Sequence, residues 1–241
     1  MKKVLITGAN KSIGFETARQ LLAKGYFVYL GSRDLQKGEK AVNTLKAAGF
    51  ENIKTIQIDV SDPASVTAAR KQVDALDILI NNAGIKENIP PDAAMTDIDS
   101  IRKVFDTNFF GAIQVTQTFL DLLQQSAEPR IVNVTSGLAS LTLHSDPSWK
   151  YYHLKRAGYG PSKTALNAYT VVLAYELKNT AFKVNAVDPG FTATDFNDHR
   201  GTGTVEDAAK IIVKYATIGA DGPSGKFFSN EIDTESKESA W

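Results

Sequence analysis

A tyrosine and a lysine stand four positions apart in the segment 159–163, YGPSK. Pro161 is tolerated only in the first turn of a helix, so the segment predicts the start of one. Residues four apart share one helix face, about one turn from each other. A phenol with a pKa near 10 is a slow acid–base catalyst at neutral pH, and a neighbouring ammonium lowers that pKa. The spacing therefore predicts proton transfer by Tyr159 assisted by Lys163, although many helices contain such a pair by chance.

Two more polar residues are placed where they can join this pair. Ser136 directly follows the apolar segment 131–135, where its hydroxyl can hold a carbonyl oxygen beside Tyr159. Asn108 is an amide inside an otherwise apolar helical stretch. A buried amide needs hydrogen-bond partners, and this one can hold an ordered water next to Lys163. Taken singly, Ser136 is a loop serine and Asn108 a helix-bending amide, but together with the pair they indicate a catalytic site.

A loop with two glycines follows the first apolar segment and runs into a helical pattern, at 7–14 (TGANKSIG). Glycines let the backbone turn tightly, so that phosphates reach the amides and the positive end of the helix. Two glycines alone are more often turn chemistry, but the strand–turn–helix context favours a nucleotide site. The residues expected around the phosphates are Gly8, Asn10, Lys11, Ser12, Ile13 and Gly14.

The end of the second predicted strand indicates which dinucleotide binds. An NAD site usually has an acidic residue there for the ribose 2′-hydroxyl. This chain has Arg33, and Lys11 lies in the phosphate loop. Two cations favour the 2′-phosphate of NADP(H), because an arginine fork binds phosphate oxygens in a bidentate manner. The alternative is that both are solvated surface charges; the neighbouring Asp34 is interpreted as a helix cap.

The next two strand ends carry further candidates for the cofactor site. Asp59 and Val60 follow the third predicted strand, and Asp59 can accept from the adenine amino group. Asn82, Ala83 and Gly84 follow the fourth, where small residues and an amide can shape the cofactor floor. Read singly, each is also explained as a turn or a cap.

Short apolar runs alternate with segments of helical period along the whole chain. Strands are expected at 4–7, 27–31, 53–58, 78–80, 131–135 and 184–187, with a seventh at 225–229. Helices are expected near 13–24, 35–48, 62–74, 98–125, 160–178 and 205–216. The alternation predicts an α/β fold: one Rossmann domain over 1–241, a doubly wound parallel sheet of about seven strands with helices on both faces. Asp34 and Ser61 are the expected N-caps, and Gly25 and Gly49 the expected C-cap glycines.

The composition excludes several other classes of site. Lys plus Arg and Asp plus Glu number 27 each, so net charge gives no argument for nucleic acid or an anionic membrane as partner. The chain has no cysteine, and its three histidines have no metal-binding spacing, so no metal site is expected. No segment resembles a signal peptide or a membrane span, which favours a cytoplasmic protein.

Together, these motifs resemble the short-chain dehydrogenase/reductase family along essentially the whole chain. The resemblance implies that Tyr159 is the general acid or base and that Lys163 lowers its pKa and binds the cofactor ribose. It further implies that Ser136 polarises the carbonyl and that Asn108 supports a proton relay. A segment containing Pro189, Gly190, Thr192 and Thr194 would meet the nicotinamide carboxamide. Lys11, Arg33 and the tail 222–228 resemble the carbonyl-reductase-like members.

Two features depart from the family pattern. Ser12 replaces the middle glycine of the phosphate loop, where glycine permits a positive φ, so its effect on cofactor affinity is open. Ser136 and Tyr159 are widely separated, and the residues between them include Leu138, Leu141, Leu143, Trp149, Tyr151 and Tyr152. This aromatic stretch either walls a pocket for a bulky apolar carbonyl compound or packs onto the core or a partner subunit. The short segment after Gly190 predicts an open substrate cleft.

The sequence therefore predicts an NADP(H)-dependent oxidoreductase that transfers a hydride between the nicotinamide and a carbonyl or alcohol substrate. The alternatives are a sensor that binds NADP(H) without turnover and an NAD-dependent alcohol dehydrogenase. Apolar surface on the helices at 109–123 and 162–177 indicates a homo-oligomer. Substrate identity, reaction direction and stereochemistry do not follow from the sequence, because one fold supports many substrates.

Overall fold

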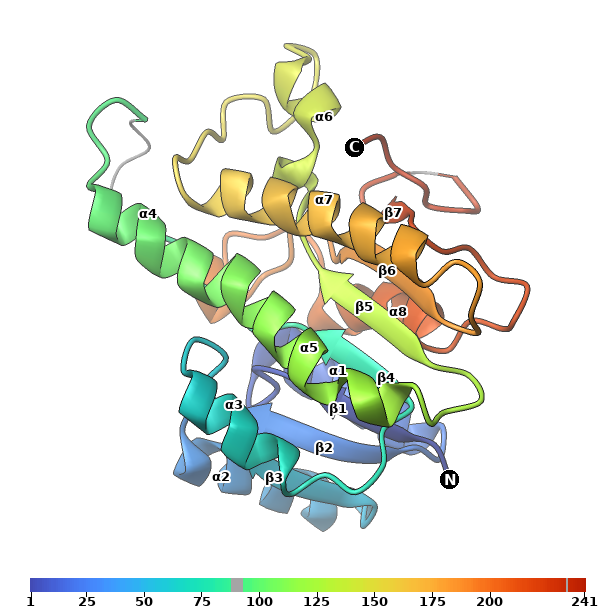
Figure 1. Cartoon of the computed structure of the whole chain (residues 1–241). Helices are drawn as coiled ribbons and strands as arrows, with labels where there is room; N and C mark the ends of the chain where they lie inside the picture. Colours follow the sequence, from blue (N-terminus) through green and yellow to red (C-terminus); the bar gives the residue numbers. More distant parts are fainter. Residues whose placement is uncertain (88–92, 233) are drawn as a thin grey trace.

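A computed structural model describes residues 1–87, 93–232 and 234–241. Its centre is a seven-stranded parallel sheet in the order β3-β2-β1-β4-β5-β6-β7 (Figure 1). The strands are β1 Lys3–Ile6, β2 Phe27–Ser32, β3 Ile53–Gln57, β4 Ile78–Asn81, β5 Arg130–Val134, β6 Lys183–Asp188 and β7 Phe227–Ser229. This confirms the predicted doubly wound Rossmann architecture, with strand ends that lie within two residues of the expected ones.

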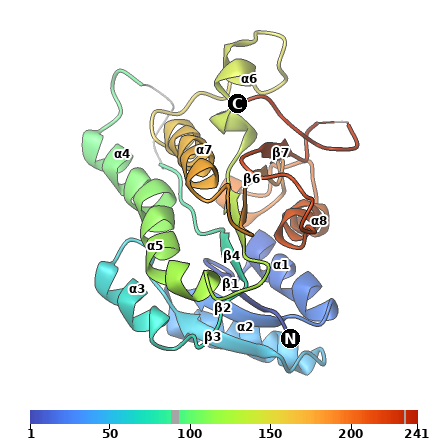
Figure 2. The same cartoon turned by 45° about the vertical axis from the view of Figure 1, so that its right-hand side comes forward.

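Helices cover both faces of the sheet (Figures 1 and 2). One face carries α1 Ser12–Ala23, α2 Leu35–Ala47 and α8 Val205–Ala216. The other carries α3 Pro63–Arg70, α5 Gly111–Leu123 and α7 Tyr159–Glu176. In a parallel sheet covered this way the inner strands are buried on both sides, whereas the edge strand β3 exposes Lys54 and Gln57.

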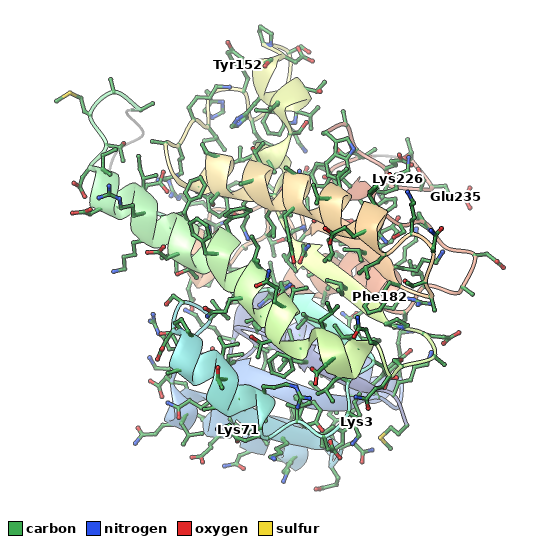
Figure 3. The ribbon with its side chains drawn as sticks, viewed as in Figure 1. Lys3, Lys71, Tyr152, Phe182, Lys226 and Glu235 are labelled. Carbon is green, nitrogen blue, oxygen red and sulfur yellow. The ribbon has the colours of Figure 1, made fainter. Side chains whose placement is uncertain are left out.

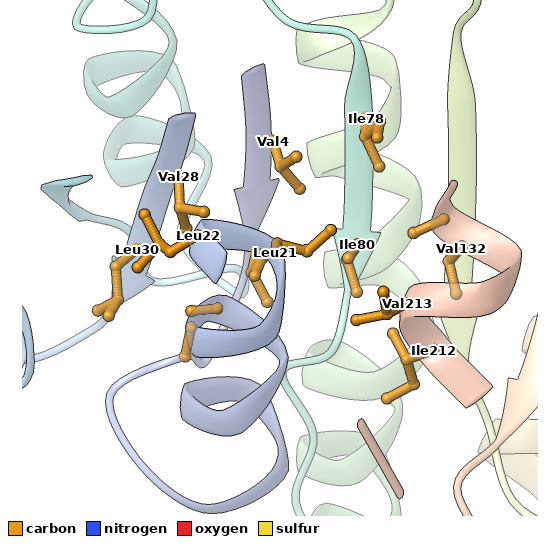
Figure 4. Packing of buried hydrophobic residues seen from close by; sticks show 14 of the residues in the cluster. Val4, Leu21, Leu22, Val28, Leu30, Ile78, Ile80, Val132, Ile212 and Val213 are labelled. Atoms are coloured by element: carbon orange, nitrogen blue, oxygen red, sulfur yellow. The ribbon is translucent and has the colours of Figure 1, made fainter. Parts of the chain in front are cut away.

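Each face of the sheet has its own hydrophobic core. Val4 and Ile6 of β1 point into the core under α1 and α8, whereas Leu5 between them points into the core under α5 and α7. This follows from the alternation of side chains along a strand. Figure 4 shows the first core, in which Leu21 of α1 and Ile212 of α8 meet the central strands. The two cores hold the strand ends at which the site is built.

Three of the expected helix boundaries are confirmed by the structure. The backbone N–H of Lys37 donates to Asp34 Oδ1 at 3.1 Å, so Asp34 is the N-cap of α2. Gly25 and Gly49 follow α1 and α2 with φ angles of +82° and +93°. Glycine has no Cβ to oppose this left-handed conformation, which ends both helices.

The expected N-cap at Ser61 is wrong. Asp62 caps α3 instead, with its Oδ1 accepting from the backbone N–H of Ala64 at 2.9 Å. Pro63 is the first helical residue and its fixed φ defines Asp62 as the cap position. Ser61 hydrogen-bonds the side chain of Asp59 through both its N–H and its hydroxyl.

The helix expected over 98–125 has two α-helical parts. α4 Ile98–Phe105 and α5 are joined by a single π-helical turn, Asp106–Phe110. Such turns insert one residue into a helix and change the direction in which the local side chains point. Asn108 lies in this turn and is 1% exposed, so the irregularity places its amide in the interior.

The segment between β5 and α7, residues 135–158, extends away from the sheet, and we call it the excursion. It contains a short 3-10 turn, Gly137–Ala139, and the helix α6 Leu141–Ser145, which lies beyond α7 and close to the C-terminus (Figures 1 and 2). The backbone N–H of Thr142 donates to the carbonyl of Trp241, so the C-terminal residue holds α6. Tyr152 lies near the tip of the excursion, on the side away from the sheet (Figure 3). Within the described ranges no helix has the length and apolar content needed to span a bilayer.

Candidate active site

The loops that carry the predicted site all leave the carboxyl edge of the sheet. β1 and β4 are neighbours at its centre, and the chain winds outward from them in opposite directions. In doubly wound sheets, ligands bind outside the strand ends at this switch point. The loops after β1, β4, β5 and β6 therefore converge on one place.

The loop after β1 is bound to the loop after β4. Thr7 Oγ1 accepts from the backbone N–H groups of Asn82 and Ala83, each at 3.0 Å. The Asn82 side-chain amide donates to the carbonyls of Thr7 and Gly8 at 2.9 and 3.1 Å. Asn82 thus holds the loop after β4 against the backbone of the loop after β1.

No side chain fits at two glycines of this loop. A Cβ on Gly8 would lie 2.9 Å from Ala83 Cα, and Gly8 has a φ of +63°. A Cβ on Gly14 would lie 2.6 Å from Asn82 Nδ2 and 2.8 Å from the carbonyl oxygen of Gly8. The result is a loop of bare backbone at the start of α1, which is the arrangement that dinucleotide phosphates require. Around it Asn10, Ser12 and Ile13 are half-buried and Lys11 is exposed.

Ser12 adopts the conformation for which glycine is usual. Its φ is +51°, in the left-handed region, and it is the first residue of α1. A residue with a Cβ pays about 1–2 kcal/mol for this conformation. The substitution of the family glycine therefore keeps the backbone shape of the loop and adds strain to it.

Ser12→Gly is expected to raise the free energy of unfolding by up to about 1 kcal/mol, because relief of the strain exceeds the entropic cost of glycine. Urea denaturation measures this. Ser12→Ala is the control: it removes the hydroxyl, keeps the left-handed strain and should bring no gain. A loss of stability in Ser12→Gly, as for glycine in an ordinary helix position, would contradict the interpretation.

The two cations expected at the 2′-phosphate each face a carboxylate. Lys11 Nζ lies 2.9 Å from Asp195 Oδ2, across from the phosphate loop. Arg33 Nε lies 4.0 Å from Asp59 Oδ2, and the Arg33 side chain is 76% exposed. Exposed ion pairs of this kind contribute little, so both side chains remain available to an anionic ligand. Among the described residues the two cations do not contact each other.

The third strand end contributes one polar and one apolar residue. Asp59 Oδ1 accepts from Ser61, which leaves its Oδ2 beside Arg33. Val60 is 6% exposed, and a Cβ on Gly111 of α5 would lie 2.8 Å from Val60 Cγ2. Val60 is therefore packed against the start of α5 as a wall, while Asp59 reaches the surface.

The structure brings Ser136, Tyr159 and Lys163 together at the end of β5. The Ser136 hydroxyl lies close enough to the Tyr159 phenol to lower its pKa, and it accepts from the backbone N–H of Leu138 at 3.2 Å. Lys163 Nζ donates to the carbonyl oxygen of Val134 at 2.8 Å and lies 6.0 Å from the centre of the Tyr159 ring. The half-buried phenol and the buried ammonium thus lie on one face of α7, one turn apart, as their spacing predicts.

The pKa of Tyr159 is shifted in the direction opposite to the expected one. Burial raises it well above the usual value, and Asp188 and Glu87 raise it further by their negative charges. The Ser136 hydroxyl and the positive charge of Arg156 oppose this only in part. Burial in turn lowers the pKa of Lys163 to about 8. Desolvation of the phenolate therefore has a larger effect on the pKa of Tyr159 than the positive charge of Lys163, and Tyr159 is protonated at neutral pH.

All polar atoms of the Asn108 amide are bound to the protein. Its Oδ1 accepts from the backbone N–H of Ile85 at 2.8 Å, and its Nδ2 donates to the Ile85 carbonyl at 2.9 Å and to Ser162 Oγ at 3.0 Å. Ser162 Oγ donates to the carbonyl of Tyr159 at 2.7 Å. A Cβ on Gly84 would lie 3.4 Å from both Asn108 Oδ1 and Lys163 Nζ, which places Gly84 between them. Asn108 therefore joins the loop after β4 to the first turn of α7.

The loop after β6 closes the other side of the site. Gly190 has a φ of +83°, and the Thr192 hydroxyl donates to its carbonyl at 3.2 Å. Thr192 and Thr194 are 4% and 5% exposed, and Thr194 caps the short turn Asp195–Asn197. Pro189 is also buried. The Lys11–Asp195 pair brings this loop against the phosphate loop, where the sequence places the nicotinamide contacts.

Part of the aromatic excursion packs beside this loop. His144, Trp149, Tyr151 and Phe191 form a row of edge contacts, with successive ring centres 5.5 Å apart. Trp149 lies against Gly137, the residue after Ser136. Trp149 and Tyr151 pack beside Gly137 and the loop after β6, whereas Leu141 is 64% exposed.

Leu138 and Leu141 line a hollow of about 430 Å³ between α6 and α7, together with Gly160 and Pro161. The side chains of the neighbouring Leu143 and Tyr152 lie half-buried and exposed respectively. The residues that line this hollow include neither Tyr159 nor Ser136.

Sequence reasoning did not find four residues that shape the site. Phe196 lies with its ring centre 5.3 Å from that of Tyr159. Asp188 is buried at the end of β6, where burial raises its pKa, and its carboxylate accepts from Ser229 at 2.6 Å and from the Gly190 N–H at 3.0 Å. Ser162, in the first turn of α7, donates to the carbonyl of Tyr159, and Glu87 accepts from the backbone N–H of Tyr159. Only Ser162 had a local signal, its place next to Lys163; the others come from loops that the topology alone brings close.

Among the residues that the structure describes, no cluster of three or more histidine or acidic side chains is arranged to hold a metal ion. The polar groups at the reacting end are the hydroxyls of Ser136 and Tyr159. They can donate to a carbonyl oxygen, and a protonated phenol can pass its proton to that oxygen.

The sequence matches the family described as short chain dehydrogenase over residues 2–204. It is 39% identical to the short-chain dehydrogenase anuI of Penicillium roqueforti, with 96% of this chain and 94% of the relative aligned. It is 33% identical to a (+)-neomenthol dehydrogenase of Capsicum annuum, covering 93% and 94% of the two chains. The fold is similar to that of an NADPH-bound carbonyl reductase from chicken fatty liver, with a TM-score of 0.84, 27% identity and 100% and 99% of the two chains covered. The chain belongs to the short-chain dehydrogenase/reductase family and is an oxidoreductase acting on carbonyl and alcohol groups.

Proposed function

We propose that this protein is an NADP(H)-dependent oxidoreductase that reduces a ketone or aldehyde, or oxidises the corresponding alcohol. The observation that carries the proposal is the placement of Tyr159, with Ser136 beside its phenol and the buried Lys163 ammonium one turn away on the same face of α7, 6.0 Å from the ring centre. These side chains lie at the same edge of the sheet as the bare backbone loop around Gly8 and Gly14. A proton donor and a phosphate-binding loop at one edge are what carbonyl reduction with a dinucleotide needs.

Each residue has a role that follows from its surroundings. A bound nicotinamide supplies the hydride in reduction and accepts it in oxidation. Ser136 donates a hydrogen bond to the carbonyl oxygen, and Tyr159 gives that oxygen its proton, which the raised pKa keeps on the phenol at neutral pH. Lys163 donates to a ribose hydroxyl and supports the phenolate left behind. Asn108 holds the first turn of α7 in place.

The rest of the cofactor binds the loops around these residues. We place the phosphates on Gly8, Asn10, Lys11, Ser12, Ile13 and Gly14, the adenosine end on Arg33, Asp59 and Val60, and the nicotinamide end between Asn82–Gly84 and the loop with Pro189, Gly190, Thr192 and Thr194. One domain over residues 1–241 then carries both cofactor and substrate sites. The bare glycine backbone supports this placement.

The preference for NADP(H) rests on the tip of β2. Arg33 is exposed and is the first residue after β2, and the carboxylate of the next residue, Asp34, caps α2. Asp59 faces Arg33 only at 4.0 Å, so a phosphate can replace it as the partner. The chicken carbonyl reductase, of similar fold, binds NADPH.

The substrate class follows from the walls of the site. Phe196 lies next to the Tyr159 ring, and the Trp149–Tyr151–Phe191 row begins beside Gly137, the residue after Ser136. These rings favour an apolar carbonyl or alcohol compound. The name of the (+)-neomenthol dehydrogenase relative agrees with such a substrate class.

Phe110, Val172 and Tyr175 of the π turn and α7 are 56%, 56% and 68% exposed, and the expected self-association stays a prediction.

The direct test is NADPH oxidation, followed by the absorbance of the reduced cofactor, with a panel of apolar aldehydes and ketones. Turnover with at least one of them supports the proposal. Binding of NADPH with no turnover of any carbonyl, and no oxidation of the matching alcohols with NADP⁺, would contradict it and favour a sensor.

Arg33→Asp tests the cofactor preference. It is expected to lower kcat/KM for NADPH by about 10- to 100-fold, the effect of losing charge-assisted hydrogen bonds worth about 1.5–3 kcal/mol. NADH, which has no 2′-phosphate, should be affected less or improved. Lys40→Asp on the exposed side of α2 is the control with the same charge change. Equal losses for both cofactors would show that Arg33 does not bind the 2′-phosphate.

A further inference from the structure

Glu87 is a buried acid that has no part in the chemistry described so far. It lies in the loop after β4 and is 5% exposed. Its Oε1 accepts from the backbone N–H of Gly158 and its Oε2 from that of Tyr159, each at 3.0 Å. Acidic side chains are seldom this buried unless they are paired. Here the partners are two N–H groups at the start of the catalytic helix.

These two N–H groups belong to a helix end that lacks a local cap. The N-cap residue of α7 is Gly158, which has no side chain to accept from the first turn. The first N–H groups of a helix have no partner within the helix, and leaving them buried and unpaired is costly. A carboxylate from a distant loop binds them instead. The positive end of the helix further favours its negative charge.

The loop that carries Glu87 is itself fixed to the catalytic apparatus. Two residues earlier, the backbone of Ile85 forms both of its hydrogen bonds with the Asn108 amide. One of the Arg156 Nη atoms donates to the backbone carbonyl of Glu87 at 3.2 Å. The loop after β4 is thus held at two points, and at the second of them it holds Tyr159.

We propose that Glu87 is a positioning residue for the reaction: its carboxylate fixes the backbone of Tyr159 and ties the first turn of α7 to the cofactor side of the site. The inference rests on the proposed function, because Tyr159 must be the proton donor for its position to matter. Without Glu87 the phenol would be free to shift relative to Ser136. A displacement of about 1 Å in a reacting group costs on the order of 100-fold in rate.

The charge of Glu87 has a second effect, on the phenol itself. It raises the pKa of Tyr159, as does Asp188 at the end of β6, whereas Arg156 and the Ser136 hydroxyl lower it. Lys163 faces the ring from the next turn of α7. Removing the charge of Glu87 alone therefore lowers the pKa of Tyr159, and the loss of activity in carbonyl reduction at high pH begins at a lower pH.

The test compares Glu87→Gln with the wild-type chain in NADPH-dependent reduction. Glutamine keeps the size but turns an N–H₂ group toward one of the two backbone N–H donors. We expect kcat to fall about 10- to 100-fold, with the NADPH dissociation constant nearly unchanged and the high-pH limb moved to lower pH. Glu87→Asp keeps the charge but is one methylene too short. It should lower kcat with the high-pH limb in place.

Asp62→Asn is the matched control, because Asp62 also caps a helix with its carboxylate, at α3. It should lower the melting temperature without changing kcat or the pH profile. If Glu87→Gln behaves in the same way, Glu87 is only a helix cap and the proposal is overturned. Should Glu87→Gln not fold, unchanged kcat in Glu87→Asp overturns it equally. A wild-type chain with no turnover would overturn the proposed function together with the role of Glu87. A wild-type kcat in Glu87→Gln and Glu87→Asp would overturn the role of Glu87 alone.

Discussion

Replacing Tyr159 with phenylalanine is expected to lower kcat for carbonyl reduction by about 10²–10⁴-fold, the range that a positioned proton donor contributes. Phenylalanine keeps the ring and its contact with Phe196, and removes only the hydroxyl, whose pKa Ser136 lowers. Ser136 would then be the one hydroxyl left to meet the carbonyl oxygen, and it has no acidic proton to give. The loss should therefore fall on kcat more than on NADPH binding.

Single-turnover oxidation of NADPH and the NADPH dissociation constant separate these two quantities. Tyr169→Phe is a matched control on the same helix, because burial raises the pKa of the Tyr169 phenol to about 12 while a neighbouring hydroxyl, that of Thr116, lowers it. It removes a hydroxyl of similar surroundings away from Ser136, and kcat should stay within about twofold of the wild type. If Tyr159→Phe retains a tenth or more of the wild-type kcat, another group donates the proton.

The elements that position this site were largely predictable, for a physical reason. β1, β4 and β5 are buried on both faces, so each appears in the sequence as a short, largely apolar run. The alternation of strands and helices then leaves few possible topologies. The order of the strands then places Gly8, Ser136 and Gly190 at one edge without any knowledge of side-chain contacts. This is why the candidate residues could be assembled from positions along the chain.

What the sequence did not predict depends on contacts between distant segments. Glu87 reaches the N–H groups of residues 158 and 159 only because the loop after β4 passes the start of α7. The direction of the Tyr159 pKa shift depends on how completely the fold removes water from the phenol, and spacing along a helix does not contain that information. The π turn at Asn108 has no marker in composition, since its residues also suit a regular helix.

Burial shifts the pKa values of the proposed catalytic pair in opposite directions, upward for Tyr159 and downward for Lys163. This has a consequence for the stability of the fold. Burial favours the neutral form of each group, the phenol for Tyr159 and the amine for Lys163. Burial keeps the phenol protonated but makes it a weaker acid, and an ammonium that must support a phenolate is held against its own desolvation. Lys163 has the Val134 carbonyl as its hydrogen-bond partner, which is neutral. The protein therefore carries a stability cost at the position that the reaction needs charged.

Lys163→Met should expose this cost together with a loss of about 10²–10³-fold in kcat. The wild-type Lys163 has a pKa of about 8, against 10.5 in the unfolded chain. Between these pH values the unfolded state holds a proton that the folded state has released, so wild-type stability rises with pH by up to about 1.4 kcal/mol per unit. Methionine fills a similar volume and does not titrate, so the variant lacks this rise.

Urea unfolding of both chains at pH 7 and pH 9 measures the effect. The wild type should gain about 1 kcal/mol relative to Lys163→Met over this interval, and the variant should be the more stable chain at pH 7. Lys71→Met, at an exposed lysine after α3 (Figure 3), is the control and should change neither kcat nor this difference. A stability difference that does not depend on pH would mean that Lys163 stays charged inside the folded chain. Its pull on Tyr159 would then be stronger than the geometry of the site implies, because a full positive charge would lie one turn from the phenol throughout the working pH range.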